Sequence, residues 1–314
     1  MTALSSAQTT TFTDTGGVGP RTRLFPRAAS LTDALLEPSS SAIAAQELAD
    51  IRARMVASLE EVLGAFPTSQ RLQVTAYDVV SALEQRGEAR DFTQDADGDV
   101  TGDSGFVPSP FLCRRSIGIA AVRRCARGRA SSPSSAVREV IESALDDLKI
   151  SSPSVSAPRA PWWAQWYEGL TPGARAVVEA EAVTWATQLW TALEWNRFSR
   201  PAVIGEGDDW WRPPGRSQVA FKGRVELKAW AGPRQAFLVI GSRSPSTNWR
   251  TALAFPALVA AFARGERCAP GRVVGLWPQS GIVRVHPIDT AALCEAADAA
   301  VAAVHARLQK EPTS

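Results

Sequence analysis

The stretch QVAFKGRVELKAW, residues Gln218 to Trp230, decides the fold of the carboxy-terminal half of this chain. Its apolar residues alternate with polar ones, as in a half-buried β-strand. These apolar residues are Val219, Phe221, Val225, Leu227 and Ala229. We therefore expect one strand within RSQVAFKGRVELKAWAG, residues 216–232. Because residues two apart on a strand project from the same face, Glu226 and Lys228 should lie side by side.

The segments around this stretch alternate between helical and extended patterns. Residues 234–243, RQAFLVIGSR, are almost wholly apolar and predict a central strand covered on both faces. The order is a helix at 179–198, three strands counting the short one in 201–211, a helix at 248–264, strands at 272–278 and 281–288, and a helix at 290–308. A meander, a crossover helix and further strands predict a mixed sheet with helices packed on it. The predicted fold class is therefore α/β, with the mixed sheet of an α+β protein.

The amino-terminal half is helical by periodicity, with helices predicted at 41–66, at 74–86 and, as a pair, within 109–145. A Ser/Pro/Ala-rich stretch at 151–161 indicates a linker. All eleven tryptophans follow it, ten of them between Trp162 and Trp249, and those at helical spacing are interpreted as core. The predicted organisation is a disordered tail at 1–30, a helical domain at 31–150, the linker at 151–161 and a Trp-rich α/β domain at 162–310.

The composition is that of an ordinary soluble globular protein, with 45% hydrophobic and 21% charged residues among 314. A net charge of +2 gives no global sign of nucleic-acid binding, so that case depends on local patches. Four scattered cysteines and two histidines exclude a histidine-rich zinc site. With no signal-peptide pattern and no apolar run of about 18 residues, we expect a cytoplasmic protein without membrane contact. Arginine outnumbers lysine and alanine is abundant, as in GC-rich bacterial coding.

One predicted helix carries the strongest basic patch of the chain. Six arginines fall within sixteen residues: Arg114, Arg115, Arg123, Arg124, Arg127 and Arg129. They form either the solvated cationic face of an amphipathic helix or a surface that contacts the phosphate backbone of DNA.

An acidic stretch, DADGDVTGDSGF, resembles a calcium-binding loop in the spacing of Asp95, Asp97, Asp99 and Asp103. It lacks the glycine and the bidentate glutamate that such a loop requires. A solvated acidic loop is the favoured interpretation.

The order of elements after residue 175 resembles the PD-(D/E)xK nuclease superfamily, and within it the RecB-type branch. In that branch a strand reading x-G-R-x-D precedes one reading D-x-K. Here Gly223, Arg224 and Glu226 match the first motif. The resemblance places the second acid and the lysine near Ile240 and Ser242, where this chain has neither, so it implies a degenerate active site.

A second register makes Glu226 and Lys228 themselves the acid–lysine pair, with a further acid from Glu206, Asp208 or Asp209. Two carboxylates could then hold Mg²⁺, which activates water, while the lysine orients the nucleophile. The pair therefore has three open interpretations: an exposed ion pair, the remnant of a disabled site, or a live metal site. As an exposed pair, it would contribute little, and Glu226→Ala would change stability by under about 1 kcal/mol.

These observations favour a DNA-binding or accessory protein of a DNA-processing assembly, built on a nuclease-like fold with a degenerate active site and no cofactor. The first alternative is an active Mg²⁺-dependent deoxyribonuclease with Glu226, Lys228, Asp208 and Asp209 as catalytic residues, of which Glu226 and Asp208 would also bind the metal ion. The second is a scaffold that binds a protein partner through its Trp-rich half, since Trp and Arg are favoured interface anchors.

Overall fold

The structure of the protein, a computed structural model, describes residues 28–37, 43–65, 71–86, 110–150, 160–198, 203–204, 208–216, 218–231, 233–241, 244–278 and 280–310. The acidic stretch, Glu206, Ser242 and residues 151–159 of the predicted linker lie outside these ranges. Of the predicted tail at 1–30, residues 28–30 form the start of helix α1 (Ala28–Leu36).

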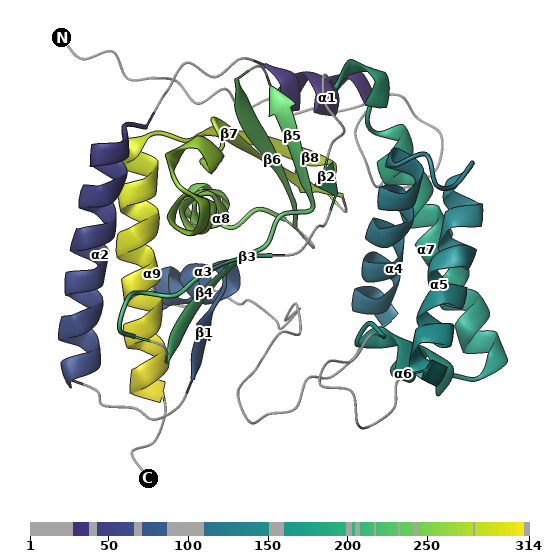
Figure 1. The fold of residues 1–314 in the computed structure, drawn as a ribbon, viewed down its shortest axis with the longest axis horizontal. Helices are drawn as coiled ribbons and strands as arrows, with labels where there is room; N and C mark the ends of the chain where they lie inside the picture. Colours follow the sequence, from purple (N-terminus) through teal and green to yellow (C-terminus); the bar gives the residue numbers. More distant parts are fainter. Residues whose placement is uncertain are drawn as a thin grey trace.

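A five-stranded mixed sheet forms the centre of the molecule (Figure 1), in the order β2-β5-β6-β7-β8. Its strands are β2 (Val203–Ile204), β5 (Leu227–Ala231), β6 (Arg234–Ile240), β7 (Arg272–Trp277) and β8 (Ile282–Pro287). β6 and β7 are parallel and joined through helix α8 (Trp249–Arg264), while the other neighbours are antiparallel. The predicted mixed α/β fold is therefore confirmed at the level of its class, and β6 is the central strand that its apolar run predicted.

The predicted strand at 216–232 is wrong in one respect, because it is two strands in two sheets. β4 (Val219–Gly223) lies between β1 (Leu72–Val74) and β3 (Asp209–Trp211) in a separate three-stranded sheet, whereas β5 belongs to the central sheet. The chain leaves β4 where Gly223 touches α8, since a Cβ there would lie 2.9 Å from Cβ of Val259. It rejoins a ladder at Glu226, whose N–H donates to the carbonyl of Leu238.

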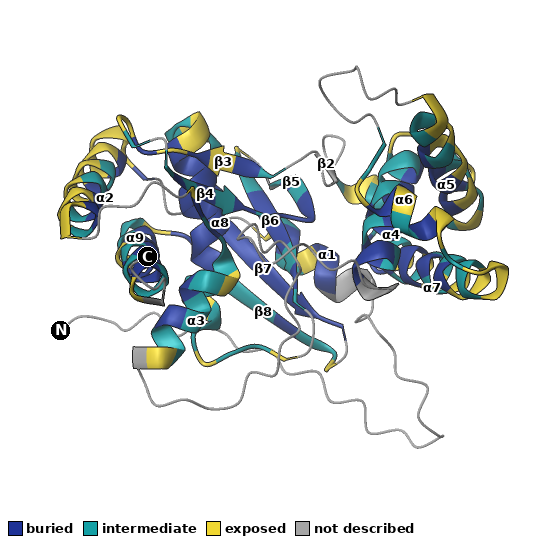
Figure 2. Cartoon of the chain, turned by 90° about the horizontal axis from the view of Figure 1, so that it is seen from below, coloured by how far each residue is buried: buried dark blue, intermediate teal, exposed yellow. Residues whose placement is uncertain are grey.

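One face of the central sheet, together with the inner face of the small sheet, packs on α8 to form the α8 core. Helices α2 (Ala45–Ala65), α3 (Ala76–Arg86) and α9 (Thr290–Lys310) cover α8 from outside. Every residue of α8 from Leu253 to Phe262 is buried, as expected of a helix that is apolar on all sides. Figure 2 shows α8 buried inside this layer, while α2 exposes its outer side.

The opposite face of the central sheet contributes to the α4 core, which is made by the remaining helices. These are α1, α4 (Pro110–Ala126), α5 (Pro133–Ile150), α6 (Trp163–Glu168) and α7 (Pro172–Thr191). α7 begins at Thr171, whose hydroxyl accepts from the N–H of Ala174, with Pro172 at its first position. α4 packs closely on α7 because Gly118 leaves room for the ring of Trp185. Trp185 is buried there, in line with its interpretation as core.

The two halves of the sequence contribute to both cores. β1, from residues 72–74, pairs with β4 in the three-stranded sheet, and α2 and α3 pack against α9. In the other direction α6 and α7, which follow residues 151–161, pack with α4 and α5. The predicted boundary at 151–161 thus joins segments that share hydrophobic cores on either side of it.

Candidate functional site

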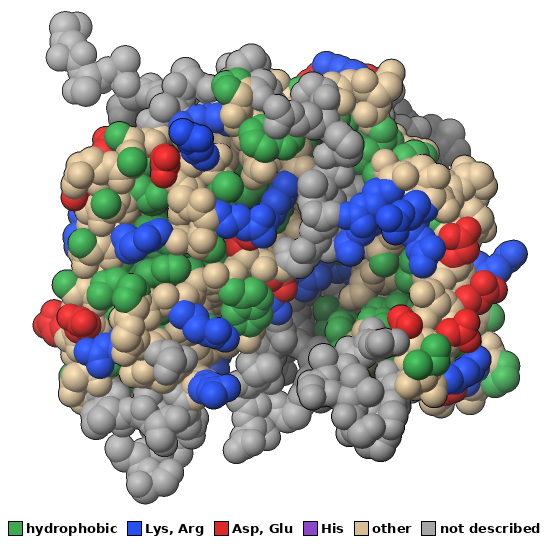
Figure 3. Space-filling model, viewed as in Figure 1, with side chains coloured by type: hydrophobic (Ala, Val, Ile, Leu, Met, Phe, Trp, Pro, Cys, Tyr) green, Lys and Arg blue, Asp and Glu red, His purple; other side chains and the backbone are tan. Residues whose placement is uncertain are grey.

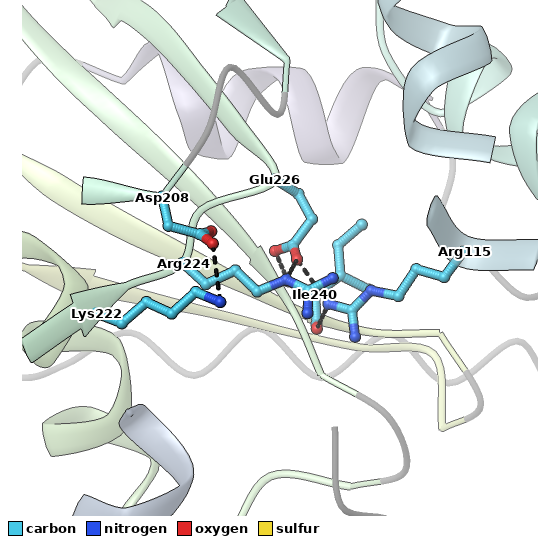
Figure 4. A network of polar contacts seen from close by, with 6 residues as sticks. All are labelled: Arg115, Asp208, Lys222, Arg224, Glu226 and Ile240. Atoms are coloured by element: carbon cyan, nitrogen blue, oxygen red, sulfur yellow. Dashed lines mark hydrogen bonds and ion pairs between the residues drawn. The ribbon is translucent and has the colours of Figure 1, made fainter. Parts of the chain in front are cut away.

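Glu226 lies at the start of β5 with its carboxylate buried, its side chain being only 1% exposed. Arg115 lies on α4, in the group of helices α4 to α7 that we call the helical body. Its Nη2 lies 2.6 Å from Oε1 of Glu226 (Figure 4). The same Nη2 donates to the carbonyl of Ile240 at 2.8 Å, and the N–H of Ile240 donates to Oε2 at 2.8 Å. The end of β6 therefore holds both members of a buried ion pair.

The guanidinium of Arg224 adds a second positive charge, with its Nε 3.3 Å from Oε1 of Glu226. A buried carboxylate is stable only when paired and hydrogen-bonded, and here both oxygens have partners. The interpretation of Glu226 and Lys228 as an exposed ion pair with each other is wrong, because Glu226 is buried and bound to Arg115.

Lys228 binds Asp209 instead, with 2.6 Å between its Nζ and Oδ2. Asp209 is also buried, and Nη2 of Arg264 lies 2.5 Å from its Oδ1. Oδ1 of Asp209 therefore gains charge compensation from Arg264, although it accepts no hydrogen bond. The structure thus unites Asp209 from β3 and Lys228 from β5, two of the residues predicted for the second register.

Asp208 is separated from Asp209 by the alternation of β3. Asp209 and Trp211 face α8, where Trp211 packs on Phe262, whereas Asp208 and Trp210 face the other way. Asp208 lies 3.2 Å from Nζ of Lys222 on the neighbouring strand. The side chains of Asp208 and Asp209 therefore cannot bind one metal ion together from the same face of β3.

Each of the three carboxylates described at this site is bound by at least one cation. Five cationic side chains take part: Lys222 binds Asp208, Lys228 and Arg264 bind Asp209, and Arg115 and Arg224 bind Glu226. Among the described residues, no group of three or more His, Cys, Asp or Glu is placed to hold a metal ion. The residues present do not fit the Mg²⁺ site that the resemblance implies, because ammonium and guanidinium groups already occupy the oxygens.

The end of β6 has no room for the acid that the resemblance expects. Ile240 is a buried core residue, and its backbone, not its side chain, contacts Glu226. A Cβ added to the next residue, Gly241, would lie 2.2 Å from Nε1 of Trp277. A carboxylate at either position would require the core or the Trp277 indole to move.

The six arginines of α4 and its end do not form one surface. Arg114 pairs with Glu181 on α7, and Arg124 pairs with Glu139 on α5. Arg115 points inward to Glu226. Burial lowers the pKa of Arg123, and the nearby charge of Arg127 lowers this pKa further. The remaining cluster, the α4 arginine end, comprises Arg123, Arg127 and Arg129, the last two being exposed.

Three features of this region were not predicted from the sequence: Arg115 as the partner of Glu226, Arg264 as a partner of Asp209, and the exposure of Trp210. Arg115 carried a signal, because it lies on the same helical stripe as Ile119 and Val122, which are buried. A charged residue on the apolar stripe of a helix indicates a buried ion pair.

No protein-family model matches the chain, and no curated protein or solved structure is detectably similar to it. In the part of the chain that the structure describes, no helix combines the length and apolarity of a membrane span.

Proposed function

We propose that the protein binds DNA without cleaving it, using a nuclease-like fold whose acidic positions are neutralised by its own cations. The observation that carries this proposal is the buried contact between Arg115 and Glu226. The guanidinium of Arg115 contacts the Glu226 oxygen that a metal ion would require. A second cation, Lys228, contacts Asp209 in the same way.

The energetic reason is that these cations are difficult to displace. Mg²⁺ usually keeps several of its coordinated waters, so it binds carboxylates that a hydrated ion can reach. At Glu226 it would have to expel Arg115, leaving a guanidinium buried without its partner, which is strongly unfavourable. Binding of a metal ion and retention of this fold therefore oppose each other.

Attraction to DNA is supported by two cationic surfaces. On the outer face of the small sheet, Lys222 lies opposite Trp210 and is bound to Asp208, and Arg224 follows two residues after Lys222; we call this surface the Trp210 face. The second surface is the α4 arginine end. On the face turned to the viewer in Figure 3, Lys and Arg side chains form a patch over the helices on the right and lie scattered over the part on the left. Contacts of Lys and Arg with phosphates release counterions, which makes binding depend on salt.

The test is a gel-shift and anisotropy series with a DNA of about 30 nucleotides, in duplex and single-stranded form, over increasing KCl. We expect the affinity to fall steeply with salt, and the log–log slope to become shallower by about 1 to 2 in the double variant Lys222→Gln/Arg224→Gln. Arg138→Gln, which removes an exposed arginine of α5, serves as the matched control and should leave the slope unchanged. Absence of binding at low salt would overturn the proposal.

The competing function is a metal-dependent nuclease, which would require Lys228 to leave Asp209, to which it lies at 2.6 Å, before a metal ion could bind there. An acid and a lysine at this distance are the two residue types that the resemblance associates with catalysis. This candidate predicts cleavage that requires Mg²⁺ or Mn²⁺ and disappears in both Asp209→Asn and Lys228→Met.

A further inference from the structure

Trp210, on β3, leaves a large apolar side chain in solvent. It is 42% exposed, whereas its neighbour Trp211 is buried against Phe221 and Phe262. Trp211 thus supplies the packing on α8, and the fold does not need a second tryptophan on the other face.

The surroundings of Trp210 contain two cations, Lys222 and Arg224, and one carboxylate, Asp208. Lys222 lies directly opposite it in the β3–β4 register, with its Nζ 5.3 Å from the ring centroid. Asp208 fixes that lysine from the same face, 3.2 Å away. Arg224, two residues after Lys222, is 39% exposed and continues toward Glu226 and Arg115, as Figure 4 shows for the polar members of this row.

An exposed aromatic ring within a row of cations is the arrangement that binds a single-stranded nucleic acid. The ring offers a flat surface to a base, while the neighbouring ammonium and guanidinium groups attract the phosphates on either side of it. Duplex DNA cannot use the ring in this way, because its bases are already stacked on one another. The charges of the row would attract both forms, so only the stacking discriminates between them.

We infer that the Trp210 face binds single-stranded DNA, with one base stacked on Trp210 and a neighbouring phosphate held by the guanidinium of Arg224, which is 39% exposed. This inference rests on the proposed function and narrows it, because it names the form of DNA that the protein prefers. If the inference is right, the protein prefers single-stranded to duplex DNA. Removing the Trp210 ring should abolish this preference and leave the salt-dependent attraction to DNA.

The experiment compares Trp210→Ala with Trp162→Ala in binding to oligo(dT) and to a duplex of equal length. Trp162 is the matched control, because it is similarly exposed, at 43%, but lies at the start of α6 in the helical body. We expect Trp210→Ala to weaken oligo(dT) binding about 5-fold or more, the loss typical of one stacked base, and to leave duplex binding unchanged. Trp162→Ala should bind both as the wild type does.

A second measurement uses the unaltered protein and so does not depend on how a variant folds. An oligonucleotide carrying 5-iodouracil, irradiated in the complex, should form its crosslink at Trp210, as mapped by mass spectrometry of the peptides. Normal oligo(dT) binding by Trp210→Ala, or a crosslink confined to other residues, would overturn the inference while leaving the proposed DNA binding intact. If the wild type binds no DNA at all, the proposed function itself fails.

Discussion

Arg115 and Glu226 form an ion pair of 2.6 Å between α4 and the start of β5, although 111 residues separate them in the sequence. Both side chains are almost completely buried. The pair joins the helical body to the central sheet at the position where the resemblance expects a metal-binding acid. Its stability and its charge are therefore the features that separate a DNA-binding protein from a metal enzyme.

Removing one partner of this pair should destabilise the protein strongly. Arg115→Met leaves the Glu226 carboxylate buried with only Arg224 beside it, so we expect a loss of about 3 to 5 kcal/mol in the free energy of unfolding. Glu226→Ala should cost a similar amount, in contrast to the value of under about 1 kcal/mol that an exposed pair would give. Urea denaturation followed by circular dichroism measures both.

The matched control is Arg114→Met, which removes a neighbouring arginine from a half-exposed pair with Glu181. This change should cost under about 1 kcal/mol. The double variant Arg115→Met/Glu226→Gln should recover most of the stability, since the amide oxygen of the introduced glutamine keeps an acceptor for the N–H of Ile240. Equal, small effects of all these changes would show that the pair is exposed in solution.

The two hydrophobic cores predict that cutting the chain within residues 151–161 does not separate its halves. We expect a protein with an engineered protease site in that segment to stay in one piece after cleavage, because β1 pairs with β4 and α4 packs on α7. Native mass spectrometry and size-exclusion chromatography report whether the two fragments remain bound. Fragments that elute separately and stay folded would instead support two independent domains.

His286 predicts a loss of stability in mild acid. Burial and the nearby charge of Arg250 lower its pKa to about 4, against 6.5 in the unfolded chain, with Asp289 opposing them. Between these values the unfolded state binds more protons, so the free energy of unfolding falls as the pH drops from about 6.5 toward 4. Because the ring is only half-buried, we expect the free energy of unfolding to fall by about 2 kcal/mol over this range.

The measurement is a series of urea denaturation curves between about pH 4 and 7 for the wild type and His286→Gln. The variant lacks the titrating ring, so its stability should depend less on pH over this range. Parallel curves for the two proteins would assign the acid sensitivity to other groups.

The thiol of Cys113 should be unreactive in the folded protein. It is fully buried on α4, and burial raises its pKa to about 12, so very little thiolate forms at about pH 8. We expect a disulfide reagent to modify half-buried Cys268 first and Cys113 only as fast as α4 opens. Arg115→Met should accelerate the modification of Cys113, whereas rapid modification in the wild type would contradict a firmly docked α4.

Several elements could be predicted from the sequence because their signals are local. The apolar run of β6 predicted a central strand, and the helical spacing of Leu48, Ile51 and Met55 predicted α2, where all three are buried. The break between β4 and β5 could not be predicted. The alternation continues through it, although Val225 belongs to the α8 core and Leu227 to the α4 core. Periodicity shows which residues are buried but not which sheet they join.

The candidate site was predictable in its residue types and only partly in its contacts. Lys228 contacts Asp209, whereas Glu226, which the second register pairs with Lys228, binds Arg115. The partner of Glu226 was beyond the reach of local patterns, because Arg115 comes from a helix far away in the sequence. The exposure of Trp210 and the burial of Trp211 depend on which face of β3 meets α8, and this is decided by packing.

The most direct test of DNA binding without cleavage follows one labelled oligonucleotide through both events. Wild-type protein and oligo(dT) are mixed at low salt with Mg²⁺, the anisotropy is recorded, and the same samples are then resolved on a denaturing gel. We predict a salt-sensitive complex, weakened in Lys222→Gln/Arg224→Gln, and an intact oligonucleotide. Cleavage that requires Mg²⁺ and is lost in both Asp209→Asn and Lys228→Met would contradict this prediction and establish a nuclease.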